Sequence, residues 1–248
     1  NESQFDLHKM MKLLTMDVFG QVALLSNFGC CRDLKPIPVL ESFEFLSSDF
    51  IYRVSSGILD PTNLFYSLPT KGNRERARHD RVLRDFVENI VSERRQEIEN
   101  GANEVDLMTH LLESIESAEA ITDTLFTLLF AGYATTAVSL AYTLYLIFTH
   151  EHVLTKCREE IEHQAKATSL EYPYLEAVVT ESLRLYPPAI STTRNLEKDL
   201  EIVGVLVPKD TYLYIPIWFI HRSPKVFADP LKFNPERWLN NDDTNAKA

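Results

Sequence analysis

The sequence has few cysteines, few glycines and no excess of positive charge. Its 248 residues include 3 cysteines and 7 glycines, and 36 acidic residues outnumber 25 basic ones, giving a formal net charge of -11. Because nucleic-acid-binding domains usually carry a basic surface, this balance argues against a general nucleic-acid role. The three cysteines form no Cys-x-x-Cys pair and no metal-ligand spacing, and an odd number argues against a disulfide framework and for a reducing compartment. We expect ordinary thiols at Cys30, Cys31 and Cys157.

Several motifs of common enzyme classes are also missing. The sequence has no Gly-x-Gly-x-x-Gly, no Gly-x-x-x-x-Gly-Lys-Ser/Thr, no Gly-x-Ser-x-Gly and no His-Glu-x-x-His. These are the usual signs of dinucleotide binding, phosphate loops, α/β-hydrolases and zinc proteases. The chain begins at Asn1 without a signal-peptide pattern and ends in a polar tail after Trp238. We therefore expect it to be a piece of a longer polypeptide.

Hydrophobic periodicity predicts a mainly α-helical chain with a small β part. Apolar residues recur at helical spacing in residues 5–28, 73–99, 106–115, 124–149, 151–165 and 172–185. Residues 32–72 are less regular and are interrupted by prolines. After Pro187 and Pro188 the pattern changes, and residues 200–207 and 211–217 are typical of two hairpin strands joined by a turn at Pro208. No internal repeat is present, so we expect one domain over residues 1–248.

The predicted helix over residues 124–149 contains no charged residue. At 1.5 Å per residue it would span roughly 39 Å, which is enough to cross a bilayer. Its many hydroxyl groups favour instead a helix buried inside a large helical protein. Gly132 costs roughly 1 kcal/mol relative to alanine at the middle of a helix, so something must offset it. The candidates are a close neighbouring helix, a membrane, or a flat ligand pressed against the backbone.

Glu181 and Arg184 are three residues apart on a predicted helix and can pair. As a surface pair they would contribute well under ~1 kcal/mol. Apolar neighbours around Glu181 favour burial, and a buried carboxylate has about four acceptor sites, more than one arginine fills. Arg237, in a proline-bounded segment, is a candidate for the second arginine.

Two further polar residues have competing interpretations. Arg194, just before the strand-like part, is either solvent-facing or a clamp for an anionic group, because guanidinium binds carboxylates in a bidentate fashion. His221 has no second histidine at metal-ligand spacing, so we expect a structural role for it.

These motifs, taken in order, resemble those of the cytochrome P-450 family of haem-thiolate monooxygenases. AGYATT (131–136) is similar to its central-helix motif, Ala/Gly-Gly-x-Asp/Glu-Thr-Thr, and ESLR (181–184) to its Glu-x-x-Arg helix. HRSPKVFADPLKFNPERW (221–238) is similar to its His-Arg-Asp-Pro and Pro-Glu-Arg-Phe segment. The resemblance covers roughly the middle half of a typical member. It implies a partial cytochrome P-450 fold, with a central long helix, the Glu-x-x-Arg helix, a β hairpin and the start of the meander.

The resemblance also implies roles for individual residues. The central helix of such enzymes crosses the haem face, where Ala131 and Gly132 would leave room for the macrocycle and oxygen. Thr135, with Thr136 beside it, would support proton delivery during oxygen activation. Arg194, by its spacing to Asp199, would bind a haem propionate. The substrate pocket would include Ile190, Ser191, Thr192 and Thr193, and the buried structural network would comprise Glu181, Arg184 and Arg237.

Two departures from the family pattern matter for function. Ala134 stands where an acidic residue usually precedes the threonine, and members that lack this carboxylate include enzymes that rearrange peroxides or dehydrate. The family's Phe-x-x-Gly-x-Arg-x-Cys-x-Gly segment does not follow Trp238. We therefore expect the cysteine that binds the haem iron to lie beyond residue 248, no metal ligand within these residues, and no catalysis by this chain alone.

The resulting expectation is a haem-dependent monooxygenase that inserts one oxygen atom from dioxygen into a small apolar organic substrate. Its electrons would come from an NADPH-dependent reductase. The 221–238 segment resembles the microsomal type, so the full protein is expected on the cytoplasmic face of the endoplasmic reticulum membrane, held by a segment preceding Asn1. Two alternatives stay open: a member that rearranges peroxides, and a truncated, non-catalytic protein that binds a partner or a lipid.

Overall fold

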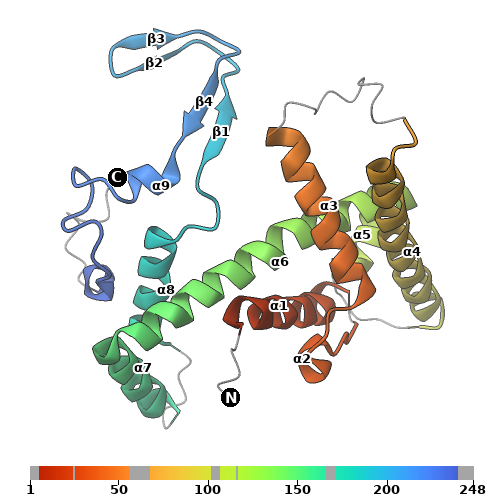
Figure 1. Cartoon of the computed structure of the whole chain (residues 1–248), viewed down its shortest axis with the longest axis horizontal. Coiled ribbons are helices and arrows are strands. Elements are labelled where there is room, and N and C mark those ends of the chain that lie inside the picture. Colours follow the sequence, from red (N-terminus) through yellow and green to blue (C-terminus); the bar gives the residue numbers. More distant parts are fainter. Residues whose placement is uncertain are drawn as a thin grey trace. The chain divides into compact units, whose positions relative to one another are not determined.

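The computed structural model describes residues 6–24, 26–55, 68–101, 107–115, 117–165 and 171–239 (Figure 1). The predicted fold class, mainly α with a small β part, is confirmed. The helices are α1 (Leu7–Ala23), α2 (Cys30–Asp33), α3 (Pro38–Ser55), α4 (Lys71–Glu99), α5 (Leu107–Ser114), α6 (Ala118–Thr149), α7 (Glu151–Gln164), α8 (Pro173–Leu185), α9 (Ile217–Ile220) and the 3-10 helix η2 (Pro235–Trp238). The strands are β1 (Thr192–Asn195), β2 (Leu200–Ile202), β3 (Val205–Val207) and β4 (Tyr212–Ile215).

The chain divides into two compact units, an N-terminal unit of residues 1–137 and a C-terminal unit of residues 138–248. The long helix α6 supplies its first part to the N-terminal unit and its last part to the C-terminal unit. Among the described residues, Glu119–Thr149 is one helix long and apolar enough to cross a membrane by length and composition. Core helices of large helical proteins meet the same criterion, so composition alone does not assign this helix to a bilayer.

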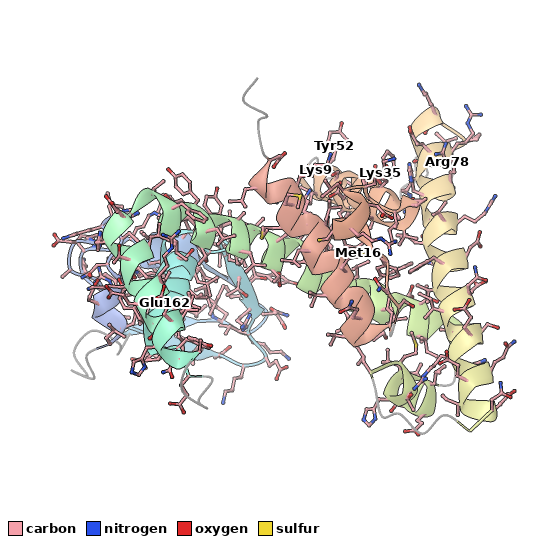
Figure 2. The ribbon with its side chains drawn as sticks, turned by 90° about the horizontal axis from the view of Figure 1, so that it is seen from below. Lys9, Met16, Lys35, Tyr52, Arg78 and Glu162 are labelled. Atoms are coloured by element: carbon pink, nitrogen blue, oxygen red, sulfur yellow. The ribbon has the colours of Figure 1, made fainter. Side chains whose placement is uncertain are left out.

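The N-terminal unit packs α1, α3, α4 and the first part of α6 around an apolar core. Met16, labelled in Figure 2, is fully buried there. Side-chain caps start two of the helices: the Asp6 carboxylate accepts from the Lys9 N–H at the start of α1, and the Thr70 hydroxyl accepts from the Asn73 N–H at the start of α4. The core includes Leu13, Met16, Cys30, Leu40, Phe43, Leu83, Leu129 and Tyr133.

The C-terminal unit has a core of its own, formed by the last part of α6, α7, α8 and the segment before η2. Pro173 occupies the first turn of α8, where its missing N–H costs nothing. The Glu160 carboxylate of α7 accepts from the N–H groups of Tyr174 and Leu175, at 2.7 and 2.9 Å, and so caps α8 from outside. The core comprises Leu146, Ile147, Val153, Cys157, Tyr174, Val178, Leu185 and Phe233.

The predicted strand pairing was wrong. Residues 200–207 do not pair with 211–217; they form a hairpin of their own, in which β2 pairs with β3 and Ile202 lies opposite Val205. Val203 and Gly204 both have positive φ, 50° and 77°, as in the two-residue turns that connect tight hairpins. Strand β4 pairs instead with β1, which places Arg194 opposite Leu213.

The irregular pattern predicted for residues 32–72 was also wrong over α3. Pro38 interrupts nothing, because it is the first residue of the helix, where proline is tolerated. Leu40 and Phe43 are buried three residues apart, which is helical spacing. Pro61 lies outside the described residues.

Candidate functional site

The AGYATT segment lies on α6, and its two faces differ sharply. A stripe at four-residue spacing, Leu125, Leu129 and Tyr133, is buried in the N-terminal unit. By helical spacing Ala131 and Thr135 lie away from this stripe, whereas Gly132 and Thr136 lie beside it. Ala131, Gly132 and Thr136 are nevertheless exposed, and Thr135 is half-buried. A Cβ placed on Gly132 would meet no described heavy atom within 4 Å. Close packing of a described helix therefore does not explain this glycine, and the small-residue face is open for another occupant.

Thr135 is held at this open face by its own helix. Its hydroxyl donates to the main-chain carbonyl of Ala131, one turn earlier. The hydroxyl oxygen is thereby oriented along the helix, on the side that Ala131 and Gly132 keep free of bulk. The residue before it, Ala134, is half-buried against the apolar core and brings no carboxylate.

Tyr133 fixes how α6 is rotated in the N-terminal unit. Its hydroxyl donates to Glu44 Oε1 at 2.9 Å, and Lys12 Nζ donates to the same oxygen at 2.7 Å. Its ring meets Phe43 edge-on, with centroids 5.8 Å apart. Burial, followed by the neighbouring Glu44 carboxylate, raises the pKa of Tyr133, so its hydroxyl stays a donor. This anchor fixes the rotation of α6 about its axis in the N-terminal unit, and sequence reasoning missed it.

A cavity of about 340 Å³ lies in the N-terminal unit beside the AGYATT segment. Phe130, which lines it, directly precedes Ala131, and its ring centroid lies 6.2 Å from that of Phe43. Sequence reasoning missed this cavity because it assigned no helix to residues 38–55; the spacing Phe43, Leu46, Phe50 was the available signal. The lining comprises Phe43, Leu46, Ser47 and Phe50 of α3, Leu83 of α4, and Phe126, Thr127 and Phe130 of α6.

In the C-terminal unit, Glu181 has an exposed fraction of 0% and accepts five hydrogen bonds. Arg184 donates to both carboxylate oxygens, from Nε and Nη2, at 2.8 Å each. Arg237 Nε and the Asn234 N–H each reach Oε1 at 3.0 Å, and Trp238 Nε1 reaches Oε2 at 2.9 Å. Burial by itself raises the pKa of the Glu181 carboxyl, but these bonds hold it below its ordinary value. The carboxylate is therefore ionised and fully satisfied.

Arg184 extends the same network into the loop after α9. Its Nη1 donates to the carbonyl oxygens of His221 and Pro230, at 2.7 Å each, and its Nη2 donates to that of Lys232 at 3.2 Å. Its guanidinium also lies 4.9 Å from the centroid of the Phe227 ring. Glu181, Arg184 and Arg237 thus form one buried network that joins α8 to residues 221–238.

His221 contacts the same network. Its Nδ1 lies 3.1 Å from the carbonyl oxygen of Arg184. Burial, and then repulsion from the charges of Arg184 and Arg222, lower the pKa of the imidazole. In the described part of the chain no group of three histidine, cysteine or acidic side chains is placed to hold a metal ion.

Arg194 occupies an exposed position on β1. Its Nη1 donates to the Thr192 hydroxyl at 2.9 Å and to the Thr193 carbonyl at 2.8 Å, and it makes no ion pair with a described residue. Ile190 is exposed and Ser191 is half-buried just before the strand. These residues belong to the C-terminal unit, whereas Thr135 belongs to the N-terminal unit.

The three cysteines are free thiols. Burial, and then the nearby Asp17 carboxylate, raise the pKa of Cys30 to about 11, and the same causes raise that of Cys31. Burial also raises the pKa of Cys157. The thiols of all three are therefore protonated at neutral pH in this structure.

Comparison with known proteins places the chain in a family. The family model described as Cytochrome P450 matches residues 1–248. The chain belongs to the cytochrome P450 family.

Three curated relatives illustrate the range of similarity. Cyclooctat-9-en-7-ol 5-monooxygenase of Streptomyces melanosporofaciens is 34% identical over 77% of this chain and 43% of its own length. Cytochrome P450 monooxygenase ORF9 of Penicillium roqueforti (strain FM164) is 30% identical over 98% of this chain and 48% of its own length. Flavonoid-6-hydroxylase of Ocimum basilicum is 31% identical over 96% of this chain and 48% of its own length. The chain thus spans about half the length of the curated relatives it matches.

Family membership implies a haem whose iron is bound by a cysteine thiolate. The open face of Ala131 and Gly132 fits one side of a planar macrocycle, and the exposed guanidinium of Arg194 fits a propionate. None of Cys30, Cys31 and Cys157 stands in a Phe-x-x-Gly-x-Arg-x-Cys-x-Gly segment, so their sequence context does not fit the axial ligand. Each feature, taken within its own unit, is therefore compatible with a part of a haem.

Proposed function

We propose that the protein is a haem-dependent monooxygenase that inserts one atom of dioxygen into a small apolar organic substrate. The observation that carries this proposal is the open α6 face with Thr135 next to a cavity lined by aromatic rings. A cavity with this lining favours an apolar ligand, because it offers few polar partners. A haem with a thiolate ligand supplies the oxygen chemistry when bound.

The residues of this chain would bind the substrate, hold a proton for the reaction and contact the haem. Phe43, Phe50 and Phe130 would hold the substrate and exclude water from the α6 face. Thr135 would hold a proton at its Oγ1, with Thr136 beside it, while the small side chains of Ala131 and Gly132 would leave space for the macrocycle. Further along the chain, Arg194 would bind a propionate, and Ile190, Ser191, Thr192 and Thr193 would line the substrate pocket.

The remaining parts of the proposal lie outside these residues. We also propose a thiolate ligand from beyond residue 248, because Cys30, Cys31 and Cys157 do not stand in the family's Phe-x-x-Gly-x-Arg-x-Cys-x-Gly segment; residues 1–248 alone would then be inactive. We also propose an NADPH-dependent reductase as the electron donor and the cytoplasmic face of the endoplasmic reticulum membrane as the location. The microsomal character of the 221–238 segment supports both.

The test is Thr135→Ala compared with Thr135→Ser in the natural protein that contains this sequence. We expect the alanine variant to keep its haem spectrum but to form less product for each NADPH oxidised, because the hydroxyl proton donor is gone. The serine variant should retain most of the coupling. Equal coupling in both variants and the parent would contradict the assigned role of Thr135.

Ala134 supports a second candidate, a family member that rearranges peroxides, because the acid beside Thr135 is absent. Ala134→Asp distinguishes the two. If oxygen activation is the natural task, the new carboxylate should raise oxygen-dependent turnover. Peroxide-dependent turnover that persists without such a rise would favour the peroxide reaction.

A further inference from the structure

One face of α7 carries two charged side chains, each of which contacts another element. Lys156 and Glu160 are four residues apart, which places them one above the other on the helix. Glu160 caps the start of α8, whereas Lys156 Nζ donates to Glu236 Oε1 of η2 at 2.6 Å, across 80 residues of sequence. Neighbouring side chains of α7 therefore hold both α8 and η2.

Glu236 accepts from two donors at once. Besides Lys156, the hydroxyl of the buried Tyr174 reaches the same oxygen at 3.3 Å, and the Lys156 ammonium lies 5.3 Å from the centroid of the Tyr174 ring. Burial by itself raises the pKa of the Glu236 carboxyl, but its hydrogen bonds, first that from Lys156, hold it below its ordinary value. Burial, and then Glu236, raise the pKa of Tyr174, so its hydroxyl stays a donor. We call Lys156, Tyr174 and Glu236 the α7 clamp.

The α7 clamp and Glu181 hold η2 from different sides. Asn234 and Arg237 are three residues apart, about one turn of a 3-10 helix, and both donate to Glu181 of α8. Glu236 lies about a third of a turn from Arg237 around the same axis and faces α7. A short helix held on one side only can still rock about that contact. Contacts from two separate directions fix its orientation.

The ion pair of the α7 clamp is too exposed to contribute much to global stability. The side chains of Lys156 and Glu236 are 49% and 36% exposed, and ion pairs in such positions contribute little to the free energy of unfolding. The Glu181 network already joins this segment to α8. The consequence of the α7 clamp is therefore local, because it limits the movement of η2 and of the chain that continues from it.

We propose that Lys156 is a positioning residue for the haem iron ligand, because through Glu236 it sets the direction in which the chain leaves η2. The inference rests on the proposed function, in which a thiolate from beyond residue 248 binds the iron. Residues that do not touch a metal still orient the ligands that do, and a site is held most precisely when its supporting elements are fixed. Lys156 itself touches neither haem nor substrate in this assignment.

The experiment compares Lys156→Met with Lys156→Arg in the natural protein that contains this sequence. Methionine keeps most of the apolar stem but cannot donate to Glu236, whereas arginine can. The first readout is amide hydrogen exchange in η2, where the N–H groups of Arg237 and Leu239 donate to the carbonyls of Asn234 and Glu236. We expect exchange about two- to fivefold faster in Lys156→Met, the range that corresponds to an exposed ion pair, and unchanged exchange in Lys156→Arg.

The second readout is spectroscopic and reports the iron ligand. The Soret band of the ferrous carbon monoxide complex distinguishes a thiolate ligand from a neutral one. In dilute denaturant Lys156→Met should lose the thiolate form about two- to fivefold faster than the parent, while the midpoint of global unfolding stays unchanged. Lys156→Arg should behave like the parent. Adding Lys156→Met to Glu236→Gln should cause no further loss, because the charged partner is already gone.

The matched control is Arg158→Met, which removes one positive charge from an exposed position of α7 and should behave like the parent. An equal effect there would overturn the proposal, since the charge of α7 rather than the contact would then matter. Unchanged exchange in Lys156→Met would overturn it too, as would faster exchange without faster loss of the thiolate form. A lowered unfolding midpoint that accounts for both changes would show that Lys156 only stabilises the fold. A parent without the thiolate spectrum would overturn the proposed function, and this inference with it, before any substitution is made.

Discussion

Arg237 Nε and Glu181 Oε1 lie 3.0 Å apart although 56 residues separate them in the sequence. The bond joins η2 to the buried middle of α8. Together with Arg184 it places two guanidinium groups on one carboxylate whose exposed fraction is 0%. A buried charge of this kind is stable only while all of its partners are present. The network therefore acts as a single structural element, which fixes the segment between α9 and η2 against α8.

Removing the charge of Glu181 should be strongly destabilising. Glu181→Gln leaves Arg184 and Arg237 buried without a counter-charge, and we expect a loss of about 3 kcal/mol or more in the free energy of unfolding. Glu176→Gln, on the exposed side of the same helix, should change it by less than about 0.5 kcal/mol. Denaturant titration of the natural protein measures both. Similar stabilities for the two variants would show that the network is not a structural element.

His221 should make stability depend on pH. Its pKa is lowered in the folded state by burial and by Arg184 and Arg222, whereas the unfolded chain titrates near 6.5. The stabilisation is therefore complete above about pH 6.5 and is lost as the pH falls through the lower folded pKa, because the unfolded state binds the proton first. His221→Gln should flatten the pH dependence of the unfolding free energy between about pH 7 and 5. An unchanged slope would exclude His221 as its cause.

The elements with the clearest local signals were those that sequence reasoning predicted. Periodicity placed α4, α7 and α8 within about two residues of their observed ends. The β pairing was wrong because Val203 and Gly204 turn the chain inside a stretch that appears as one continuous strand, and only backbone angles reveal that turn. Helix α3 was missed because the prolines of residues 32–72, Pro38 among them, were interpreted as interruptions of a regular pattern.

The candidate site also contains residues that short sequence motifs reveal and contacts that they do not. Gly132, Thr135 and Glu181 stand in short motifs, so sequence alone could single them out. The bond from Tyr133 to Glu44 joins residues 89 positions apart, and no local pattern encodes it. The cavity beside Phe130 is lined partly by α3. Because sequence reasoning did not predict α3, it could not predict the cavity either.

Arg194 should matter for haem retention and not for folding. Its side chain is exposed, and it bonds only within its own strand among the described residues. We expect Arg194→Gln to keep the unfolding free energy of the apoprotein within about 0.5 kcal/mol. If it binds a propionate, haem should transfer to apomyoglobin about tenfold faster than from the parent, or more, since a charged hydrogen bond contributes about 1.5–3 kcal/mol. Arg158→Gln is the matched control, and equal transfer rates would exclude the propionate contact.

Substitution by alanine should have opposite effects on stability at Gly132 and at Gly20. A Cβ on Gly20 would lie 2.6 Å from the Phe28 ring and 2.7 Å from the Ser26 carbonyl oxygen, so Gly20→Ala should destabilise the protein by about 1–3 kcal/mol. A Cβ on Gly132 meets no described heavy atom within 4 Å, and alanine is the better helix former, so Gly132→Ala should stabilise the apoprotein by up to about 1 kcal/mol. The same methyl group would occupy the face assigned to the macrocycle. Gly132→Ala should therefore lower haem occupancy, measured by the pyridine haemochrome spectrum, while thermal unfolding of the apoprotein shifts upward. Unchanged occupancy would show that this face does not contact the haem, and the reason for a glycine in the middle of α6 would have to be sought elsewhere.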